Sequence, residues 1–271
     1  NAHAGSIWRV DWAHPQFGQV IATCSADTYV KIYKETDGKE DGADGSKAKF
    51  VRVHDLPDSR QPVTDVKFSP KHHGLKLATC GKDGMVRIYE ALDVMNLANW
   101  SLLENFKAKG KSECTSISWN PSKDKAHGLM LAVGTKPIGE QAAMVGVSTV
   151  GIWELQETRR WSLVSERFDE IKEAVHDVAF APNFGRSYHL LAVAAQSRVY
   201  ILKMTAATAA DGGDPTKKYK IEVLFEDAEP LTVWRVAWNV TGTVLASAGH
   251  GPQVRLWKTD YKGEWKGHWI S

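Results

Sequence analysis

Short hydrophobic stretches alternate with turn-forming residues along the whole chain. In one such stretch Val30 and Ile32 alternate with a lysine and a tyrosine, and this two-residue period is that of a β-strand whose two faces differ. The other stretches are also rich in Val, Ile and aromatic residues, and Gly, Pro, Asn or Asp separates them. The pattern therefore predicts a chain built of short β-strands.

One of these hydrophobic segments recurs five times and ends each time in an aromatic residue. The copies begin at residues 7, 63, 114, 175 and 233, so 51 to 61 residues separate one start from the next. After each copy come a turn, a strand of small residues, a third strand and a more polar fourth strand. A period of this length is typical of repeat proteins, and four antiparallel strands per repeat predict the blades of a β-propeller.

The repeats resemble those of WD-repeat proteins. Asp27 lies six residues before Tyr33 and Asp83 lies six before Tyr89, which is the spacing of the turn aspartate in that family. His3 is similar to the histidine of the family's Gly-His element. The resemblance implies that the histidine, the aspartate, a Ser or Thr and the last aromatic residue form a buried hydrogen-bond network in each blade. The structural positions that it implies are His3, Asp27, Tyr33, Asp83, Tyr89, Trp153 and Trp257.

The fold class expected from this resemblance is an all-β, WD40-type propeller with an open ring of five four-stranded blades in a single domain. The predicted blades cover about 1–56, 57–108, 109–169, 170–227 and 228–271. The turn aspartate is absent from the last three repeats, where Gly251 takes its place in the fifth. We expect those three blades to depend on packing instead of the polar network.

Longer strings indicate one branch of the WD-repeat proteins. Trp8–Pro15 is similar to a segment shared by the COPII coat propeller and the Seh-type nucleoporins. Further strings resemble the nucleoporins alone, and these are Val86–Ala91, Asp93–Leu97, Ala181–Ser187, Trp234–Asn239 and Thr241–Ala246. The resemblance implies an open six-bladed propeller whose first blade this chain lacks. The alternatives are a COPII-type coat propeller or another WD-repeat adaptor.

The Seh-type resemblance implies particular protein partners and cellular locations. It implies a scaffold subunit of the Y-shaped complex of the nuclear pore, in the nuclear envelope, that supports nucleocytoplasmic transport. A helical-solenoid nucleoporin is expected to donate a blade, and other Y-complex subunits are expected neighbours. The resemblance also implies a role in nutrient signalling (the TOR pathway) on the surface of vacuoles or lysosomes.

An open ring leaves apolar surface at both of its terminal blades, and we expect a blade donated by a partner to pack against the last one. The residues that we predict at this partner interface are Val236, Trp238, Leu245, Val254, Leu256 and Trp257.

Composition argues against several classes of protein, namely nucleic-acid binders, membrane-inserted proteins and disulfide-stabilised proteins. The net charge is +2, from 34 basic and 32 acidic residues, which argues against direct binding of nucleic acid. No hydrophobic run has the length of a membrane span, so no membrane insertion is expected. The three cysteines are too few for a disulfide framework, and Cys24, Cys80 and Cys114 are predicted to be small buried residues.

No catalytic, cofactor or metal site is predicted. His72 and His73 have no further ligand at metal-binding spacing. A propeller hydrolase, the rival from another class, would bring carboxylates, His or Asn from several blades together at the channel. The positions that we expect at the channel rim form a mixed set that suits a metal poorly, namely Arg9, Asp65, Ser116, Asp177 and Arg235. Insertions are predicted at 34–49, 136–148 and 205–218, and their composition assigns them no function.

Overall fold

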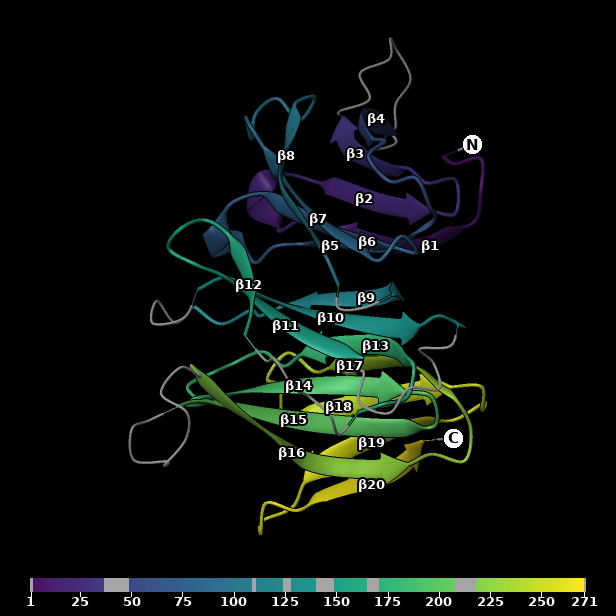
Figure 1. Ribbon diagram of the computed structural model, residues 1–271, viewed down its shortest axis with the longest axis vertical. Helices are drawn as coiled ribbons and strands as arrows, with labels where there is room; N and C mark the ends of the chain where they lie inside the picture. Colours follow the sequence, from purple (N-terminus) through teal and green to yellow (C-terminus); the bar gives the residue numbers. More distant parts are fainter. Residues whose placement is uncertain are drawn as a thin grey trace, which may run out of the picture. The chain divides into compact units, whose positions relative to one another are not determined.

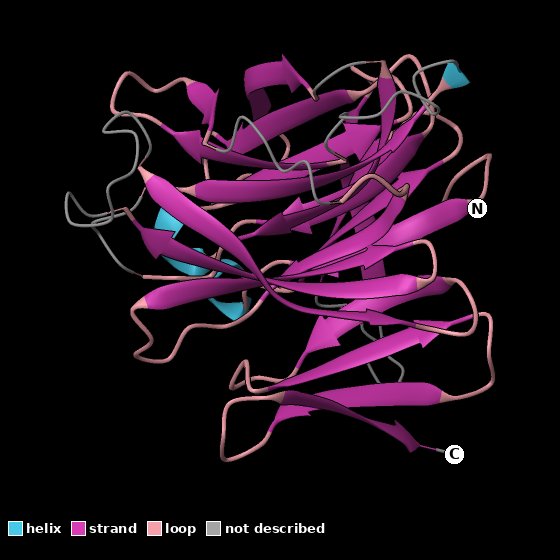
Figure 2. Cartoon of the chain, turned by 60° about the horizontal axis from the view of Figure 1, so that its bottom comes forward, coloured by secondary structure: helices cyan, strands magenta, loops and turns pink. Residues whose placement is uncertain are grey.

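The computed structural model of the chain describes residues 2–36, 49–108, 111–123, 128–139, 149–164, 171–207 and 218–270. Within these ranges, twenty β-strands form five separate four-stranded antiparallel sheets (Figure 1). Short 3-10 turns are present at η1 (Pro15–Phe17) and η2 (Lys71–His73), and strands dominate Figure 2. None of the described helices is long and apolar enough to cross a membrane.

The chain divides into two compact units, residues 1–107 and 108–271. The N-terminal unit holds the first two sheets, and in each the strands follow one another in chain order. The strands of the first sheet are β1 (Ile7–Trp12), β2 (Val20–Ser25), β3 (Val30–Thr36) and β4 (Lys49–Leu56). Those of the second are β5 (Val63–Phe68), β6 (Lys76–Gly81), β7 (Met85–Ala91) and β8 (Trp100–Lys107).

The C-terminal unit holds three sheets with the same order of strands. The third sheet consists of β9 (Ser112–Trp119), β10 (Met130–Pro137), β11 (Val150–Leu155) and β12 (Trp161–Leu163). The fourth consists of β13 (Val175–Phe180), β14 (Tyr188–Ala195), β15 (Arg198–Ala206) and β16 (Tyr219–Ala228). The fifth consists of β17 (Val233–Trp238), β18 (Val244–Gly249), β19 (Val254–Thr259) and β20 (Trp265–Ile270).

Hydrophobic side chains pack between neighbouring sheets of the same unit. One core joins the first and second sheets, and its centre includes Val20, Ile32 and Leu77. Two further cores join the third sheet to the fourth and the fourth to the fifth. Small residues in the second strands of the first four sheets, such as Ala22 and Ala192, are buried. Close approach of sheets explains why the second strands are rich in small side chains.

The all-β repeat architecture predicted from the sequence is therefore confirmed. The three cysteines are fully buried thiols, as predicted, and burial raises the pKa of the Cys24 thiol to about 12. Residues 37–48, 140–148 and 208–217, which make up most of the three predicted insertions, lie outside the described residues.

Candidate interaction surfaces and contacts between sheets

Every first strand contains a β-bulge, at its second residue in four of the sheets and at its fourth residue in β9. In each of the five strands one residue has no partner in the register with the second strand. The residues that the strand register skips are Trp8, Thr64, Thr115, His176 and Trp234. A bulge turns the next side chain away from the regular alternation. The residues redirected in this way are Arg9, Asp65, Ser116, Asp177 and Arg235.

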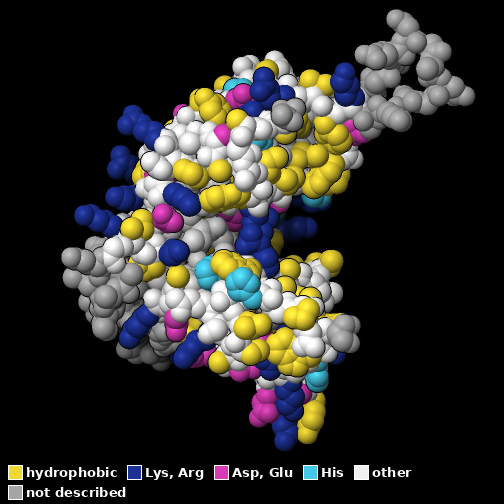
Figure 3. Space-filling model, turned by 90° about the vertical axis from the view of Figure 1, so that its right-hand side faces the viewer, with side chains coloured by type: hydrophobic (Ala, Val, Ile, Leu, Met, Phe, Trp, Pro, Cys, Tyr) yellow, Lys and Arg dark blue, Asp and Glu magenta, His cyan; other side chains and the backbone are white. Residues whose placement is uncertain are grey.

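Two of the bulged residues, Trp8 and Trp234, remain partly exposed, at 38% and 41%. The ammonium group of Lys82 lies 5.0 Å from the Trp8 ring centroid. The Trp234 ring lies 4.3 Å from that of His176 and 5.4 Å from that of His250. Histidine and hydrophobic side chains also lie side by side on the face seen in Figure 3. Both tryptophans pack against neighbouring side chains at the surface.

Asp177 joins three successive sheets. Its Oδ1 accepts a hydrogen bond from the Ser116 hydroxyl of the third sheet at 2.7 Å, and its Oδ2 accepts one from the Val236 N–H of the fifth at 3.2 Å. The Ser116 hydroxyl in turn accepts the Val178 N–H at 3.1 Å. Asp177 is 5% exposed and Ser116 is fully buried. These side chains satisfy backbone N–H groups at the free edge of each first strand.

The N-terminal unit repeats this arrangement with other residue types. The fully buried carboxylate of Asp65 lies 3.4 Å from the Arg9 Nε of the neighbouring sheet. The Asp11 carboxylate accepts the Phe68 N–H at 2.8 Å, and it pairs with the Lys67 ammonium at 3.2 Å. The prediction that Asp65, Ser116 and Asp177 line a channel rim is therefore wrong. The bulge turns them into the space between sheets, where they link one sheet to the next.

The polar network implied for the first sheet is present. His3 Nδ1 lies 2.9 Å from the Asp27 carboxylate, and His3 Nε2 lies 2.8 Å from Thr23 Oγ1. The carboxylate also accepts the N–H groups of Ala4 and Tyr29 at 2.9 and 3.1 Å. Tyr33 differs from the expectation, because its hydroxyl donates to the Ala2 carbonyl at 3.2 Å. The network ties the segment before β1 to the turn between β2 and β3.

Protonation of Asp27 should weaken the first sheet in acid. Burial raises the pKa of this carboxyl, but the hydrogen bonds from Tyr29, His3 and Ala4 outweigh it and lower the pKa to about 2. Because the pKa is lower in the folded chain, the ionised carboxylate stabilises the fold at pH values above its ordinary pKa of 3.8. This contribution is lost as the pH falls toward about 2. Asp27→Asn should therefore cost about 1 kcal/mol at neutral pH and less in acid. Thermal unfolding of both proteins across this pH range measures the difference, and a difference independent of pH would contradict the assignment.

The second and third sheets use other contacts at the equivalent positions. Asp83 pairs with the guanidinium of Arg87 at 2.6 Å, because no histidine faces it. The Tyr89 hydroxyl donates to Asp58 at 2.9 Å. Trp153 is half-buried at the end of β11. The aspartate and the aromatic residues thus keep structural roles without the full network.

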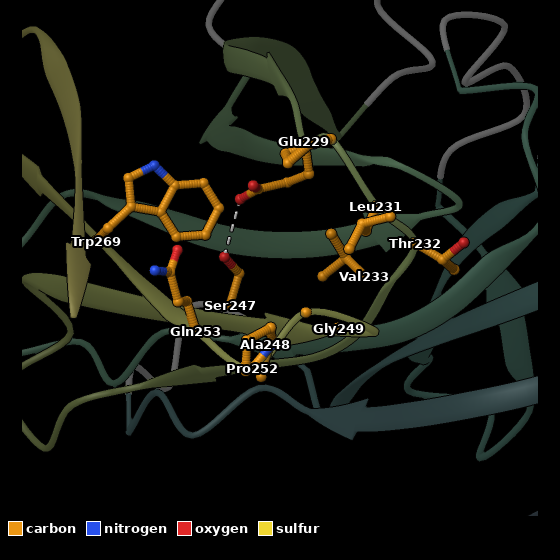
Figure 4. Close-up of a pocket in the computed structure, with 12 residues that line it drawn as sticks. Glu229, Leu231, Thr232, Val233, Ser247, Ala248, Gly249, Pro252, Gln253 and Trp269 are labelled. Atoms are coloured by element: carbon orange, nitrogen blue, oxygen red, sulfur yellow. Dashed lines mark hydrogen bonds between the residues drawn. The ribbon is translucent and has the colours of Figure 1, made fainter. Parts of the chain in front are cut away.

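The fifth sheet has a polar network that the sequence did not predict. The indole Nε1–H of Trp257 donates to Ser247 Oγ at 2.9 Å. The Ser247 hydroxyl donates in turn to Glu229 Oε1 at 3.2 Å, and Figure 4 shows this second bond. Glu229 lies four residues before the first strand, as His3 does in the first sheet. Arg255 pairs with Glu229 at 3.5 Å and stacks on the Trp257 ring at 4.0 Å. The expectation that this sheet depends on packing alone is therefore wrong.

The six residues predicted at a partner interface lie on two faces of the fifth sheet. Val236, Leu245 and Trp257 are at most 5% exposed and belong to the core shared with the fourth sheet. Trp238 faces the same way, since its indole Nε1–H donates to the Ala179 carbonyl at 2.9 Å. These four side chains are therefore not on a free surface.

Val254 and Leu256 lie on the opposite face of the fifth sheet. Val254 is 39% exposed, and Leu256 is half-buried. The equivalent residues of the first sheet, Val30 and Ile32, are 2% and 0% exposed because the second sheet covers them. Ile270, paired with Val254 across β19 and β20, is 49% exposed on the same face. We call this surface, formed by Ala237, Ala246, Val254, Leu256 and Ile270, the uncovered face.

The first sheet has the exposed apolar face expected of a terminal blade, although none of its residues was predicted. Val10 and Trp12 are 51% and 53% exposed, and the Trp12 ring contacts that of Phe50 at 5.8 Å between centroids. Val10 and Trp12 are equivalent to Val236 and Trp238, which the fourth sheet helps to bury. Alignment of the repeats could have identified the residues of this face, because equivalent positions lie on the same face of the sheet in every blade.

No group of three or more His, Cys, Asp or Glu side chains that could hold a metal ion occurs in the part of the chain that the structure describes. His72 and His73 stack on one another, with ring centroids 4.1 Å apart. The exposed apolar faces of the first and fifth sheets are of the kind that protein partners cover.

Five four-stranded sheets with a repeated bulge and a His–Asp–Thr network define the class of WD40-type β-propeller proteins. The WD40 family, described as WD domain, G-beta repeat, matches residues 1–34, 50–90 and 223–258.

Individual relatives narrow this class. The chain is 46% identical to Nucleoporin SEH1 of Homo sapiens over 266 residues, which are 97% of this chain and 72% of that protein. It is 46% identical to Nucleoporin SEH1-B of Xenopus laevis over 265 residues, with coverage of 97% and 72%. It is 44% identical to Nucleoporin SEH1 of Danio rerio over 266 residues, with coverage of 97% and 71%. The chain therefore belongs to the SEH1 nucleoporin family, and the Seh-type resemblance is confirmed.

Proposed function

We propose that this chain is a non-enzymatic scaffold subunit of the nuclear pore complex, and that a helical-solenoid nucleoporin adds a β-sheet to its uncovered face. Membership of the SEH1 nucleoporin family supports the pore assignment. The exposure of Val254 supports the sheet addition, because its equivalents Val30 and Val199 are buried under the next sheet. A further sheet on this face would remove the remaining apolar area from water.

Arg235 suggests the chemistry of the added sheet. It occupies the position of Arg9, whose guanidinium pairs with Asp65 on the next sheet at 3.4 Å. Arg235 is exposed, and its Nη1 donates to the Trp234 carbonyl at 2.9 Å. An added sheet with Asp or Glu at the position of Asp65 would therefore form the same ion pair with Arg235. Burial between two sheets would strengthen that pair relative to one on the surface.

Reversing the charge of Arg235 should weaken partner binding. We expect Arg235→Glu to reduce the affinity for the helical-solenoid nucleoporin about 30-fold or more, because two carboxylates would then face each other. Isothermal titration calorimetry with the full chain and the purified partner measures this effect. The matched control is Lys220→Glu, which changes the charge of an exposed residue on β16 and should leave the affinity within about twofold.

Two results would contradict the proposal. Equal affinities of Arg235→Glu and wild type would place the interface elsewhere, and Trp12→Ala would then test the exposed face of the first sheet. Affinity capture that recovers only vesicle-coat components would favour the COPII-type alternative. The nutrient-signalling role on vacuoles or lysosomes and the contacts with other Y-complex subunits remain predictions, and the same captured material tests them.

A further inference from the structure

A hollow of about 330 Å³ lies between the fourth and fifth sheets, away from the uncovered face. Its polar and aromatic walls come from the turn before β14, from β14 and β15, and from the fifth sheet. The residues that matter here are Arg186, Tyr188, Lys203, Thr243, Thr259 and Trp265. None of the described residues that line this hollow is Asp or Glu. The side chains of Arg186 and Lys203 therefore have no carboxylate beside them among the residues that line the hollow.

Arg186 is held in place by the backbone of both sheets. Its Nη1 donates to the Gly242 carbonyl at 2.9 Å and its Nη2 to the Pro182 carbonyl at 2.6 Å. A side chain at residue 242 would come within 2.3 Å of the Pro182 oxygen, and the backbone φ there is +66°, so glycine is required. The turn is thus built closely around the guanidinium, and burial lowers the pKa of Arg186.

Two donors at this hollow are buried and have no acceptor among the described residues. These are the Nε–H of Arg186 and the indole Nε1–H of Trp265. Buried donors are normally satisfied, so an acceptor from water or a ligand is expected beside them. The Lys203 ammonium lies 4.9 Å from the Tyr188 ring centroid, and the Arg186 guanidinium carbon lies 5.8 Å from the same centroid. Both cations therefore lie close to Tyr188 in the wall of the hollow.

We propose that this hollow binds an oxyanion, a phosphate or carboxylate group carried by a side chain of a partner protein. A guanidinium, an ammonium and an indole N–H together supply charge and directed donors for the oxygen atoms of such a group. The Tyr188 and Trp265 rings and the Thr243 and Thr259 hydroxyls provide room for the rest of the side chain. This site is separate from the uncovered face, so its test does not depend on the proposed function.

The test follows the indole Nε1–H signal of Trp265 in the full chain by NMR, with Trp265→Phe to assign it. Inorganic phosphate and acetate are titrated separately at constant ionic strength, with chloride as the balancing anion. We expect a saturable downfield shift with at least one of the two oxyanions and none with chloride. Tighter binding of phosphate would indicate a phosphorylated side chain, and tighter binding of acetate would indicate Asp or Glu.

Lys203→Gln should weaken this binding about tenfold, because it removes one of the two charges. This variant is preferred to one at Arg186, since Arg186 also holds the turn together. Lys220→Gln, on the neighbouring strand β16 but outside the hollow, should leave the titration unchanged. The proposal is overturned if neither oxyanion gives a saturable shift, which would mean that water alone satisfies the donors. It is also overturned if Lys203→Gln and Lys220→Gln respond alike.

Discussion

Replacing Asp177 with alanine should lower the free energy of unfolding of the C-terminal unit by about 2–5 kcal/mol. The change leaves the Ser116 hydroxyl and the Val236 N–H without the carboxylate that accepts their hydrogen bonds in a buried site. Each buried donor that loses its acceptor costs about 1–3 kcal/mol. Because the two donors lie on different sheets, the substitution should loosen the contacts of the fourth sheet with both neighbours.

Urea unfolding and amide hydrogen exchange measure the effect of Asp177→Ala. Exchange at Val236 is the sharper readout, because repeat proteins can unfold in parts and blur a global transition. Asp177→Asn keeps one acceptor oxygen and should recover about half of the loss. Glu222→Ala, at a largely exposed position of β16, should change stability by less than about 0.5 kcal/mol. If Asp177→Ala has no larger effect than this control, Asp177 does not link the sheets.

Replacing Trp257 with alanine should cost about 3–5 kcal/mol, the usual range for deleting a buried aromatic side chain. Trp257 is fully buried, and its ring lies 5.1 Å from that of Phe225 in the fourth sheet. Trp257→Phe keeps most of the packing but removes the donor to Ser247, so it should cost about 1–2 kcal/mol. The difference between the two variants separates packing from the polar network.

Denaturant unfolding followed by near-ultraviolet circular dichroism measures the effect of these Trp257 variants. Tyr261→Ala is the control, since its side chain is 92% exposed in the β19–β20 turn and its removal should change stability by less than about 0.5 kcal/mol. Ser247→Ala would leave the Trp257 indole N–H without its acceptor and should resemble Trp257→Phe. Equal costs for the phenylalanine and alanine variants would show that packing of the ring contributes little.

The repeat could be predicted from sequence because every blade must bury apolar side chains against a neighbouring sheet and therefore carries the same pattern. Val30 and Ile32 must face a neighbouring sheet, so the period of two and the recurrence of the pattern identify strands and blades together. The position of Asp27 six residues before Tyr33 likewise carries enough information to predict its hydrogen bond with His3.

Contacts that depend on strand register could not be predicted in this way. The bulge at His176 turns Asp177 into the space between sheets, but a regular strand with the same sequence would place it differently. Glu229 could not be predicted from the residue types of the WD repeat, because a glutamate stands there at the position that His3 holds in the first repeat. The partner face was assigned wrongly for Val236 and Trp257. Alternation along a strand shows which residues share one face of the sheet, but it does not show which of the two faces the neighbouring sheet covers.

Hydroxyl-radical footprinting of the chain, alone and bound to the helical-solenoid nucleoporin, tests the uncovered face most directly. This method reports side-chain exposure. The face includes Leu256 and Ile270, and His268 pairs with Leu256 across β19 and β20; Ile270 is 49% exposed in the chain alone. If a sheet is added there, these residues should lose most of their reactivity in the complex, while exposed Tyr261 should keep its own. Unchanged labelling of Leu256, His268 and Ile270 in a complex that nevertheless forms would contradict the account.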